Sequence, residues 1–317
     1  MINLEEYEDF KVQVDGRPPR RLKMNHKPKK NKWEVAAALY ERDAMGKDER
    51  GFSPSVNATS GEMAWIMEHL AQFYHAELIT DVTRRVKGGK EANVYMCPAH
   101  PDSGRDLIAA KLYRPRKFRS LKNTTQYEQG RTLLNADGSP VSPHDWRLHK
   151  AIAGKSRKGL AAIQTSWLTY EFTLLQTLHW AGADVPEPIK HNECALLMEY
   201  IGDETMPAPA LIDVRLEPAE AKVVFERLIW NIEVMLQGAC VHGDLSAYNV
   251  LYWEGKISII DFPQVVDPHE NPNARFMFRR DVERVCQYFA RYGVKADARR
   301  LANDLWKNHV TPKEIVA

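Results

Sequence analysis

Two aspartates and an asparagine late in the chain have a spacing that few folds can use. A His-Gly-Asp sequence ends at Asp244, Asn249 follows five residues later, and Asp261 stands twelve residues after Asn249. Between Asn249 and Asp261 the apolar residues of 250–253 and 257–260 predict two short strands joined by a Glu-Gly turn. Such a hairpin brings Asn249 and Asp261 to the same end, close enough to bind one cation.

This pattern fits the chemistry of phosphoryl transfer from ATP. One carboxylate must orient the acceptor and take its proton, while an amide oxygen and a second carboxylate hold Mg²⁺ against the phosphates. Asp244 has the position of the first carboxylate, and Asn249 and Asp261 have the positions of the metal ligands. A structural hairpin that carries these residues by chance is the alternative, but a dry hairpin would not place acids at both ends of one edge.

The residues upstream agree with a nucleotide site. The segment 86–95 predicts a strand, a glycine turn and a second strand, although only Gly89 fits the three-glycine pattern of ordinary protein kinases. Lys111 interrupts an apolar strand, and a buried charge needs an anion such as the α- and β-phosphates of ATP. A helix predicted over 167–180 carries Glu171, which can pair with Lys111.

From about Thr80 to about Gly293 the sequence resembles the RIO family of atypical serine/threonine protein kinases. The resemblance is carried by five segments: Gly89 to Tyr95, Leu197 to Gly202, Met206 to Pro209, His242 to Asn249, and Arg279 to Val282. The first and third segments are specific, whereas His-Gly-Asp with a later Asn is shared by several kinase-like families. Those two segments look closer to the first RIO branch and Asp-Phe-Pro-Gln at 261–264 to the second, so no branch is assigned.

The resemblance implies a bilobal, protein-kinase-like α+β fold with a small β-rich N-lobe and a helical C-lobe. It implies that ATP is bound by the phosphate loop, the buried lysine with its partner, and the hinge: Gly89, Lys90, Glu91, Lys111, Glu171, Met198, Glu199, Tyr200 and Ile201. It implies catalytic roles for Asp244 and Asp261, and Mg²⁺ binding by Asn249 and Asp261.

Three departures from ordinary protein kinases, all usual in RIO proteins, bear on the reaction. Ser246 replaces the lysine that neutralises the transferring phosphate, and Pro263 replaces the glycine that lets the metal-binding loop flip. Between Asp261 and Arg280 there is hardly room for the long activation loop that docks a peptide. We therefore expect generic peptides to be poor acceptors. RIO proteins are also thought to act as ATPases, in which the metal-binding aspartate, here Asp261, accepts the phosphate.

Two further expectations concern residues near the site. Asp281 is expected to open a helix and to accept hydrogen bonds from nearby backbone N–H groups, a structural rather than a chemical role. If the protein labels itself, the acceptor is Asp261, as an acyl phosphate, or one of three hydroxyl side chains, Ser120, Thr124 and Thr125.

Composition excludes several other classes. The 317 residues suffice for two lobes, and 44% hydrophobic with 27% charged residues is ordinary for a soluble globular protein. No run of about 18 apolar residues predicts a membrane span, and the segment 1–10 is acidic, unlike a signal peptide. The four cysteines form no Cys-x-x-Cys pair, so reduced thiols in a cytoplasmic protein are expected.

Two basic segments favour a polyanionic partner, and RNA is the first choice. The resemblance implies that this RNA belongs to a ribosomal particle. Arg17 to Lys32 has eight Lys or Arg among sixteen residues, with no acid and three prolines, which predicts disorder. The segment 115–162 has ten basic residues against three acids, at the position of a mobile insert in RIO proteins. Solvated surface without a partner is the alternative, although a net charge of only +2 favours the partner.

The predicted organisation has three parts. Residues 1–56 are a basic, disordered tail, residues 57–197 are the N-lobe with the insert 115–162, and residues 198–317 are the helical C-lobe with the catalytic loop. A capping box at Thr59 to Glu62 is expected to start a helix whose inward side chains are Met63, Ile66, Met67, Leu70 and Tyr74. Another helix is expected to begin at Pro218 and to end at Gly238.

Three functions remain in competition. The first is an ATP- and Mg²⁺-dependent RIO-type kinase or ATPase that transfers the γ-phosphoryl group to a protein Ser or Thr, to itself, or transiently to an Asp. The second is a small-molecule phosphotransferase of the aminoglycoside or choline type, which shares the His-Gly-Asp motif but normally carries acids around a cationic substrate. The third is a non-enzymatic RNA- or ribosome-binding scaffold, which has no need for an intact set of Lys111, Asp244, Asn249 and Asp261.

Overall fold

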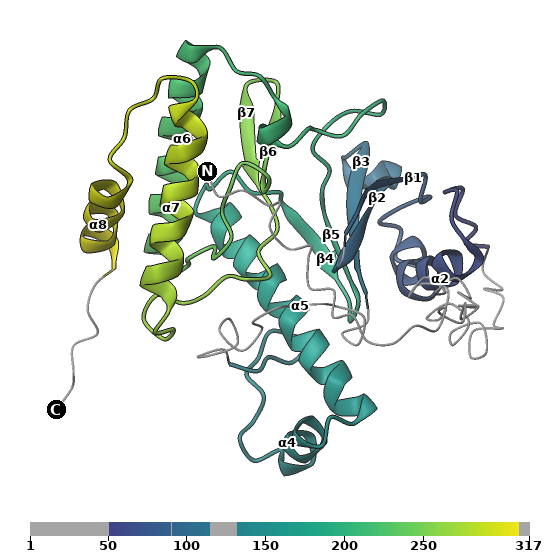
Figure 1. The fold of residues 1–317 in the computed structure, drawn as a ribbon. Helices are drawn as coiled ribbons and strands as arrows, with labels where there is room; N and C mark the ends of the chain where they lie inside the picture. Colours follow the sequence, from purple (N-terminus) through teal and green to yellow (C-terminus); the bar gives the residue numbers. More distant parts are fainter. Residues whose placement is uncertain (1–50, 90, 115–131, 311–317) are drawn as a thin grey trace, which may run out of the picture.

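The computed structural model describes residues 51–89, 91–114 and 132–310 and has the bilobal α+β architecture (Figure 1). The smaller lobe is built on a five-stranded antiparallel sheet of order β1-β2-β3-β5-β4. Its strands are β1 (Arg84–Gly88), β2 (Ala92–Pro98), β3 (Leu107–Tyr113), β4 (Pro188–His191) and β5 (Ala195–Glu199). A short 3₁₀ helix, η1 (Pro101–Ser103), follows β2.

Helix α2 (Ser60–His75) covers this sheet on the side away from the second lobe (Figure 1). Thr59 caps the helix by accepting the Glu62 N–H at 3.4 Å. The second hydrogen bond of the predicted capping box, from the Thr59 N–H to the Glu62 side chain, is replaced by another contact. The Glu62 carboxylate instead accepts the Tyr95 hydroxyl at 2.6 Å. The buried face also differs from the prediction, since Trp65 and Phe73 are buried with Ile66 and Leu70, whereas Met63, Met67 and Tyr74 are half-buried.

The folded part of the chain begins before residue 57. Phe52 and Val56 lie within the segment that was expected to be a tail, yet both are buried in the core formed by α2 and the sheet. The Val56 N–H donates to Val82 O at 2.8 Å, and Ser55 binds the Asp81 carboxylate through its backbone and its hydroxyl. These contacts attach the segment to the residues just before β1.

Two helices occupy the end of the predicted insert. Helix α4 (Trp146–Ala153) precedes α5 (Arg157–Trp180), which therefore begins ten residues earlier than the predicted start at Trp167. Ser156 caps α5 by accepting the Gly159 N–H at 3.2 Å. Gly159 permits the tight α4–α5 turn, because a Cβ there would lie 2.1 Å from Ala151 O. Together α4 and the first turns of α5 project away from both lobes (Figure 1).

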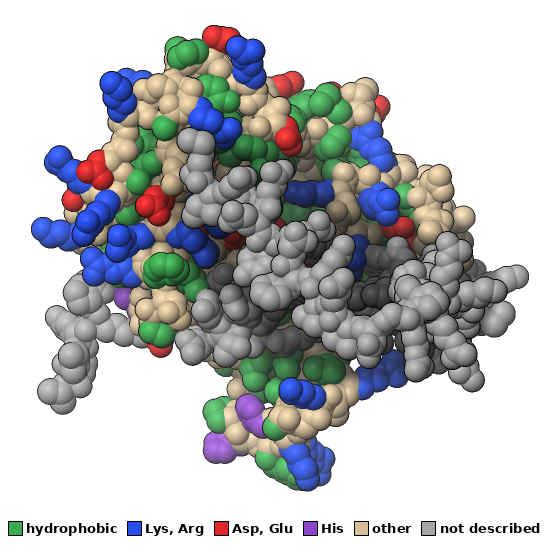
Figure 2. Space-filling model, in the orientation of Figure 1, with side chains coloured by type: hydrophobic (Ala, Val, Ile, Leu, Met, Phe, Trp, Pro, Cys, Tyr) green, Lys and Arg blue, Asp and Glu red, His purple; other side chains and the backbone are tan. Residues whose placement is uncertain are grey.

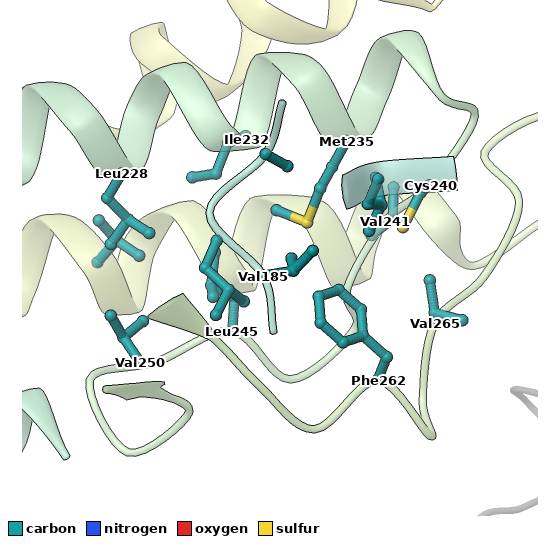
Figure 3. Close-up of a cluster of buried hydrophobic side chains, with 14 of the residues drawn as sticks. Val185, Leu228, Ile232, Met235, Cys240, Val241, Leu245, Val250, Phe262 and Val265 are labelled. Carbon is teal, nitrogen blue, oxygen red and sulfur yellow. The ribbon is translucent and has the colours of Figure 1, made fainter. Parts of the chain in front are cut away.

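The larger lobe contains α6 (Pro218–Gln237), α7 (Ala274–Ala290), α8 (Ala298–His309) and the hairpin of β6 (Val250–Trp253) with β7 (Lys256–Ile259). A 3₁₀ helix, η3 (Leu211–Asp213), connects the hinge to α6. The predicted bounds of α6 are confirmed, and its buried side chains Leu228, Ile232 and Met235 point toward Leu245 and Phe262 (Figure 3). This apolar core lies directly beneath the loop that carries Asp244. Within the described residues no helix is long and apolar enough to cross a membrane.

Candidate active site

Lys111, in the middle of β3, is held between two carboxylates. Its ammonium lies 2.9 Å from Glu171 Oε1 and 2.9 Å from Asp261 Oδ1. The predicted pairing of Lys111 with Glu171 is therefore present, although the two residues stand sixty positions apart. β3 supplies Lys111, α5 supplies Glu171, and the end of the β6–β7 hairpin supplies Asp261, so the cluster joins both lobes.

Burial and charge act in opposite directions on this cluster. Lys111 is 8% exposed, and burial alone would lower its pKa, but Asp261 and Glu171 outweigh burial and raise it well above the ordinary value. Desolvation similarly acts to raise the pKa of Asp261, while Lys111 and then His242 bring it below the usual value. The Asp261 side chain is 46% exposed and can exchange partners, whereas Glu171 is buried and also accepts the Tyr113 hydroxyl.

Asp244 projects from the loop between α6 and β6 and is bound by Arg284 of α7. The Arg284 guanidinium donates to Asp244 Oδ1 at 2.7 Å, and both side chains are partly exposed. Asn249 closes the same loop, since its amide nitrogen donates to the backbone oxygen of Asp244 at 3.0 Å. That hydrogen bond leaves the carbonyl oxygen of Asn249 as the atom that can bind a cation.

The hairpin brings Asn249 and Asp261 to the same end, as predicted. The N–H of Ile260, the residue before Asp261, donates to Asn249 O at 2.9 Å. Asp261 has φ +71°, a conformation that a non-glycine residue adopts at a cost and that is common at functional sites. One carboxylate and one amide oxygen suit Mg²⁺, which proteins hold through one or two carboxylates together with substrate phosphates. Among the described residues no group of three or more His, Cys, Asp or Glu could hold a metal instead.

His242 is a neutral, structural member of the site. Burial lowers its pKa, although Ile260 O and the neighbouring carboxylates oppose this effect. One ring nitrogen lies 3.2 Å from Ile260 O and the other accepts the Asp244 N–H at 3.3 Å, an arrangement that a single neutral tautomer satisfies. His242 therefore connects the Asp244 loop to the strand that ends at Asp261.

The prediction that Asp281 opens a helix is wrong, because Asp281 lies in the middle of α7. Its predicted contact is present, since Asp281 Oδ2 accepts the Gly243 N–H at 2.8 Å. The neighbouring Arg280 donates to Gly243 O, so one turn of α7 fixes both sides of this residue. Gly243 has φ +77°, and a Cβ there would lie 2.5 Å from Gln264 O, which explains the glycine of the His-Gly-Asp motif.

The predicted hinge lies at the end of β5. Within it the Glu199 N–H donates to Glu187 O at 2.8 Å, and Ile201 O accepts the Ala208 N–H at 2.9 Å. Those two backbone groups of the hinge are therefore engaged in hydrogen bonds within the protein. Tyr200 is buried, and its hydroxyl accepts from Arg84 of β1 at 3.2 Å, which ties the hinge to the edge of the sheet.

The predicted phosphate loop joins β1 to β2. The Gly89 N–H donates to Ala92 O at 2.9 Å, which closes the turn, and Glu91 O accepts the Arg114 N–H at 2.8 Å beyond β3. Lys90 lies outside the described residues, as do Arg17 to Lys32 and the candidate acceptors Ser120, Thr124 and Thr125.

Sequence reasoning did not anticipate two contacts in the site. Tyr113 is two residues from Lys111 on the same face of β3, so the period of two in a strand carries that signal. Arg284 lies on α7 opposite the catalytic loop, and only the tertiary packing of α7 brings it to Asp244. No local pattern in the sequence marks Arg284.

Comparison with known proteins gives a consistent set of relatives. The model of the RIO domain family matches residues 143–301. Human serine/threonine-protein kinase RIO1 is 31% identical over 218 residues, which cover 68% of this chain and 34% of that protein. The RIO-type serine/threonine-protein kinase Rio1 of Haloferax volcanii is 30% identical over 213 residues, which cover 67% of this chain and 64% of that protein.

A solved structure shares the fold. The Rio2 kinase–ADP/Mg²⁺–phosphoaspartate complex from Chaetomium thermophilum superposes with a TM-score of 0.53 at 21% sequence identity, covering 88% of this chain and 76% of that one. The matches carry both RIO1 and Rio2 names, so the branch stays unassigned. The chain spans 34% of the human relative and 64% of the archaeal one. With the family model covering half of its length, the chain belongs to the RIO domain family.

Proposed function

We propose that this protein is an ATP- and Mg²⁺-dependent RIO-type serine/threonine kinase or ATPase. The observation that carries the proposal is the buried ammonium of Lys111, 2.9 Å from both Glu171 and Asp261. A cation in this position needs anionic partners, and its partner Asp261 is half-exposed and able to turn toward a bound metal. The relatives named as serine/threonine-protein kinases support the same reading.

Each element of the site has a role in this proposal. Lys111 holds the α- and β-phosphates, with Glu171 fixing its direction, and Met198 to Ile201 read the adenine. Gly89, Lys90 and Glu91 belong to the loop over the phosphates. Asn249 and Asp261 would hold Mg²⁺, which when bound neutralises charge on the β- and γ-phosphates.

The transfer to a hydroxyl acceptor uses Asp244. The acceptor oxygen forms a bond to the γ-phosphorus, the bond from that phosphorus to the bridging oxygen of ADP breaks, and the hydroxyl proton passes to the Asp244 carboxylate. Arg284 binds Oδ1 of Asp244 at 2.7 Å, so the proton would pass to Oδ2, which has only a long contact of 3.5 Å from the Asn249 amide nitrogen.

Asp261 is the candidate acceptor when no hydroxyl is bound. In that reaction its carboxylate oxygen attacks the γ-phosphorus, ADP leaves, and water hydrolyses the acyl phosphate to release phosphate and regenerate Asp261. An aspartate is ionised at neutral pH, as a nucleophile must be, and the Rio2 relative was solved with a phosphoaspartate.

The geometry gives less support to the two alternatives. A small-molecule phosphotransferase for a cationic substrate needs acids around the acceptor, but Asp244 is bound by Arg284 and the cavity beside it also contains Arg291. A pure scaffold has no use for the cluster at Lys111, which brings an ammonium and two carboxylates together across two lobes.

The partner proposal rests on the two basic segments. We infer that Arg17 to Lys32 and the insert 115–162 bind structured RNA, on a ribosomal particle, in the cytoplasm. In the described part of the insert, α4 exposes Trp146 with Arg147 against its ring, and Figure 2 shows Lys, Arg and His side chains gathered on this projection. Affinity for RNA should fall steeply with salt, and neutralising both segments should flatten that dependence. RNA binding that is indifferent to salt would contradict the inference.

Labelling with γ-³²P-ATP tests the function. We expect protein-bound label, and label on an acyl phosphate should be released by hydroxylamine and should be absent in Asp261→Asn. Asp244→Asn should lower transfer to a hydroxyl by about a hundredfold or more while ATP affinity stays within a factor of a few, because a proton acceptor acts in the transition state. No label, no ATP hydrolysis and no binding of Mg·ATP would refute the proposal.

A further inference from the structure

A cavity of about 590 Å³ opens directly beside Asp244. One wall is the catalytic loop, including Asp244 and Tyr248, and the opposite wall is one face of α7 with Arg284, Gln287 and the residue that ends the helix, Arg291. The volume lies in the range of pockets that take a small ligand or a few side chains. Since an acceptor hydroxyl must reach Asp244, this cavity is the space next to the reacting group.

The side chains around the cavity give it positive charge. Asp244 is the one acid among its lining residues, and Arg284 and Arg291 are the two cations. Arg291 lies at the exposed end of α7 with its guanidinium 4.6 Å from the centre of the Tyr288 ring, so it is directed along the wall. Figure 2 shows Lys and Arg side chains gathered over the side of the molecule where α7 and α8 lie.

The Arg284–Asp244 ion pair can open when a competing anion arrives. The two side chains are 38% and 40% exposed. Ion pairs of this exposure contribute little to stability, because water competes for both groups. A carboxylate or phosphate in the cavity can therefore take the guanidinium from Asp244, which frees the whole carboxylate to receive a hydroxyl proton.

We propose that this cavity is the acceptor site and that it selects a protein segment whose Ser or Thr is flanked by acidic side chains. The inference rests on the proposed phosphoryl transfer and adds the class of substrate. Arg284 and Arg291 bind the flanking anions, and Tyr248, whose side chain is 64% exposed at the mouth, contacts the segment beside the hydroxyl. A generic peptide without these anions gains no charged contact with Arg284 or Arg291, so it should bind more weakly than an acidic one.

A protein segment fits this cavity better than RNA does. Single-stranded RNA is held along a groove in which cations follow successive phosphates and aromatic side chains stack on successive bases. The cavity instead places two guanidinium groups and one exposed tyrosine around a single pocket. Charge complementarity over a few residues is what an acidic segment offers.

Two peptides of equal length test the site, one with Ser between Glu residues and one with the same Ser between Lys residues. Each is also made with Ala in place of Ser, so that binding can be measured by fluorescence anisotropy without transfer. For the wild type we expect the acidic peptide to be favoured by about tenfold or more, both in affinity and in kcat/KM.

Arg291→Glu should reverse this ratio in favour of the Lys peptide, and the milder Arg291→Gln should reduce it toward one. The ratio of two peptides within one variant does not depend on how much of that variant is folded. Arg299→Glu is the matched control, since Arg299 is an exposed arginine of α8 that does not line the cavity, and it should keep the ratio of the wild type.

The outcomes separate this inference from the proposed function. Acidic preference in binding, reversed by Arg291→Glu but without any transfer, would support the acidic-segment site and refute transfer to peptides. Transfer to both peptides with equal kcat/KM, or the same ratio in Arg291→Glu as in the wild type, would overturn the site and leave transfer established. Displacement of the acidic peptide by oligouridine that binds more tightly would assign the cavity to nucleic acid and would also overturn the inference.

Discussion

The buried carboxyl of Asp281 should make the stability of this protein depend on pH in an unusual direction. Burial raises the pKa of Asp281 from 3.8 to about 7, and the nearby Arg280 and Arg284 together with the backbone hydrogen bonds from Leu245 and Gly243 only partly oppose this. The folded state therefore prefers the protonated carboxyl, whereas the unfolded chain ionises it at about pH 4. The stabilisation that this provides is complete below about pH 4 and is lost as the pH rises through about 7.

The magnitude follows from the two pKa values. A carboxyl whose pKa moves from 3.8 to about 7 contributes about 4 kcal/mol over the whole range, at about 1.4 kcal/mol per pH unit. Roughly two thirds of this, about 3 kcal/mol, should be lost between about pH 5 and pH 8. Asp281→Asn removes the titration and keeps an oxygen that can accept the Gly243 N–H. The free energy of unfolding of the variant, relative to that of the wild type, should therefore rise by that amount as the pH increases.

Urea denaturation of both proteins at several pH values measures this difference. Glu204→Gln, which changes an exposed carboxyl that forms no ion pair among the described residues, is the control and should follow the wild type at every pH. A stability difference between Asp281→Asn and the wild type that stays constant over this range would refute the reasoning. It would mean that Arg280, Arg284 and the backbone donors keep the buried carboxylate ionised.

Three further outcomes follow from the structure. Asp261→Ala should abolish the Mg²⁺-dependent part of the thermal stabilisation by ATP, because it removes a proposed ligand of the metal. Scanning fluorimetry with and without Mg²⁺ measures this. If ATP raises the Tm of the wild type equally with and without Mg²⁺, the metal assignment is contradicted. Glu62→Gln should lower the free energy of unfolding, measured in urea, by about 1–3 kcal/mol. The reason is that the Glu62 carboxylate accepts hydrogen bonds from Tyr95, Asn93 and Arg85 in a largely buried cluster. A change in free energy within experimental error would show that the cluster is solvated. Gly159→Ala should speed hydrogen exchange in α4, because its Cβ meets the Ala151 backbone at 2.1 Å, while ATP affinity stays unchanged.

The parts of the site that the sequence predicted are those encoded locally or by chemical necessity. The β6–β7 hairpin has a turn signal and two short apolar runs, so its existence and the meeting of Asn249 with Asp261 followed directly. Lys111 could be paired with Glu171 across sixty positions because a lone charge in an apolar strand has to find an anion. The ends of α6 were equally well marked, by Pro218 at its start and Gly238 at its end.

The parts that were mispredicted depend on tertiary contacts. Asp281 precedes an apolar stripe and so resembles a helix cap, but Met277 and Ala274 continue the buried face of α7 one and two turns earlier. Glu62 has the spacing of a capping box, yet a buried tyrosine hydroxyl competes successfully for its carboxylate. The early start of α5 depends on Gly159, a poor helix former that is tolerated because α4 packs against it.

Helix α7 performs two separable tasks in the site. Its inner side holds the backbone of the catalytic loop, because Arg280 and Asp281 bind the two sides of Gly243. Its next turns face the cavity, where Arg284 meets a half-exposed Asp244 and Arg291 lies free of the core. If the cavity is the acceptor site, as proposed, substitutions on the outer side should change the choice of acceptor without moving the loop that carries Asp244. A change on the inner side acts on the loop itself, so it should alter turnover with every acceptor alike.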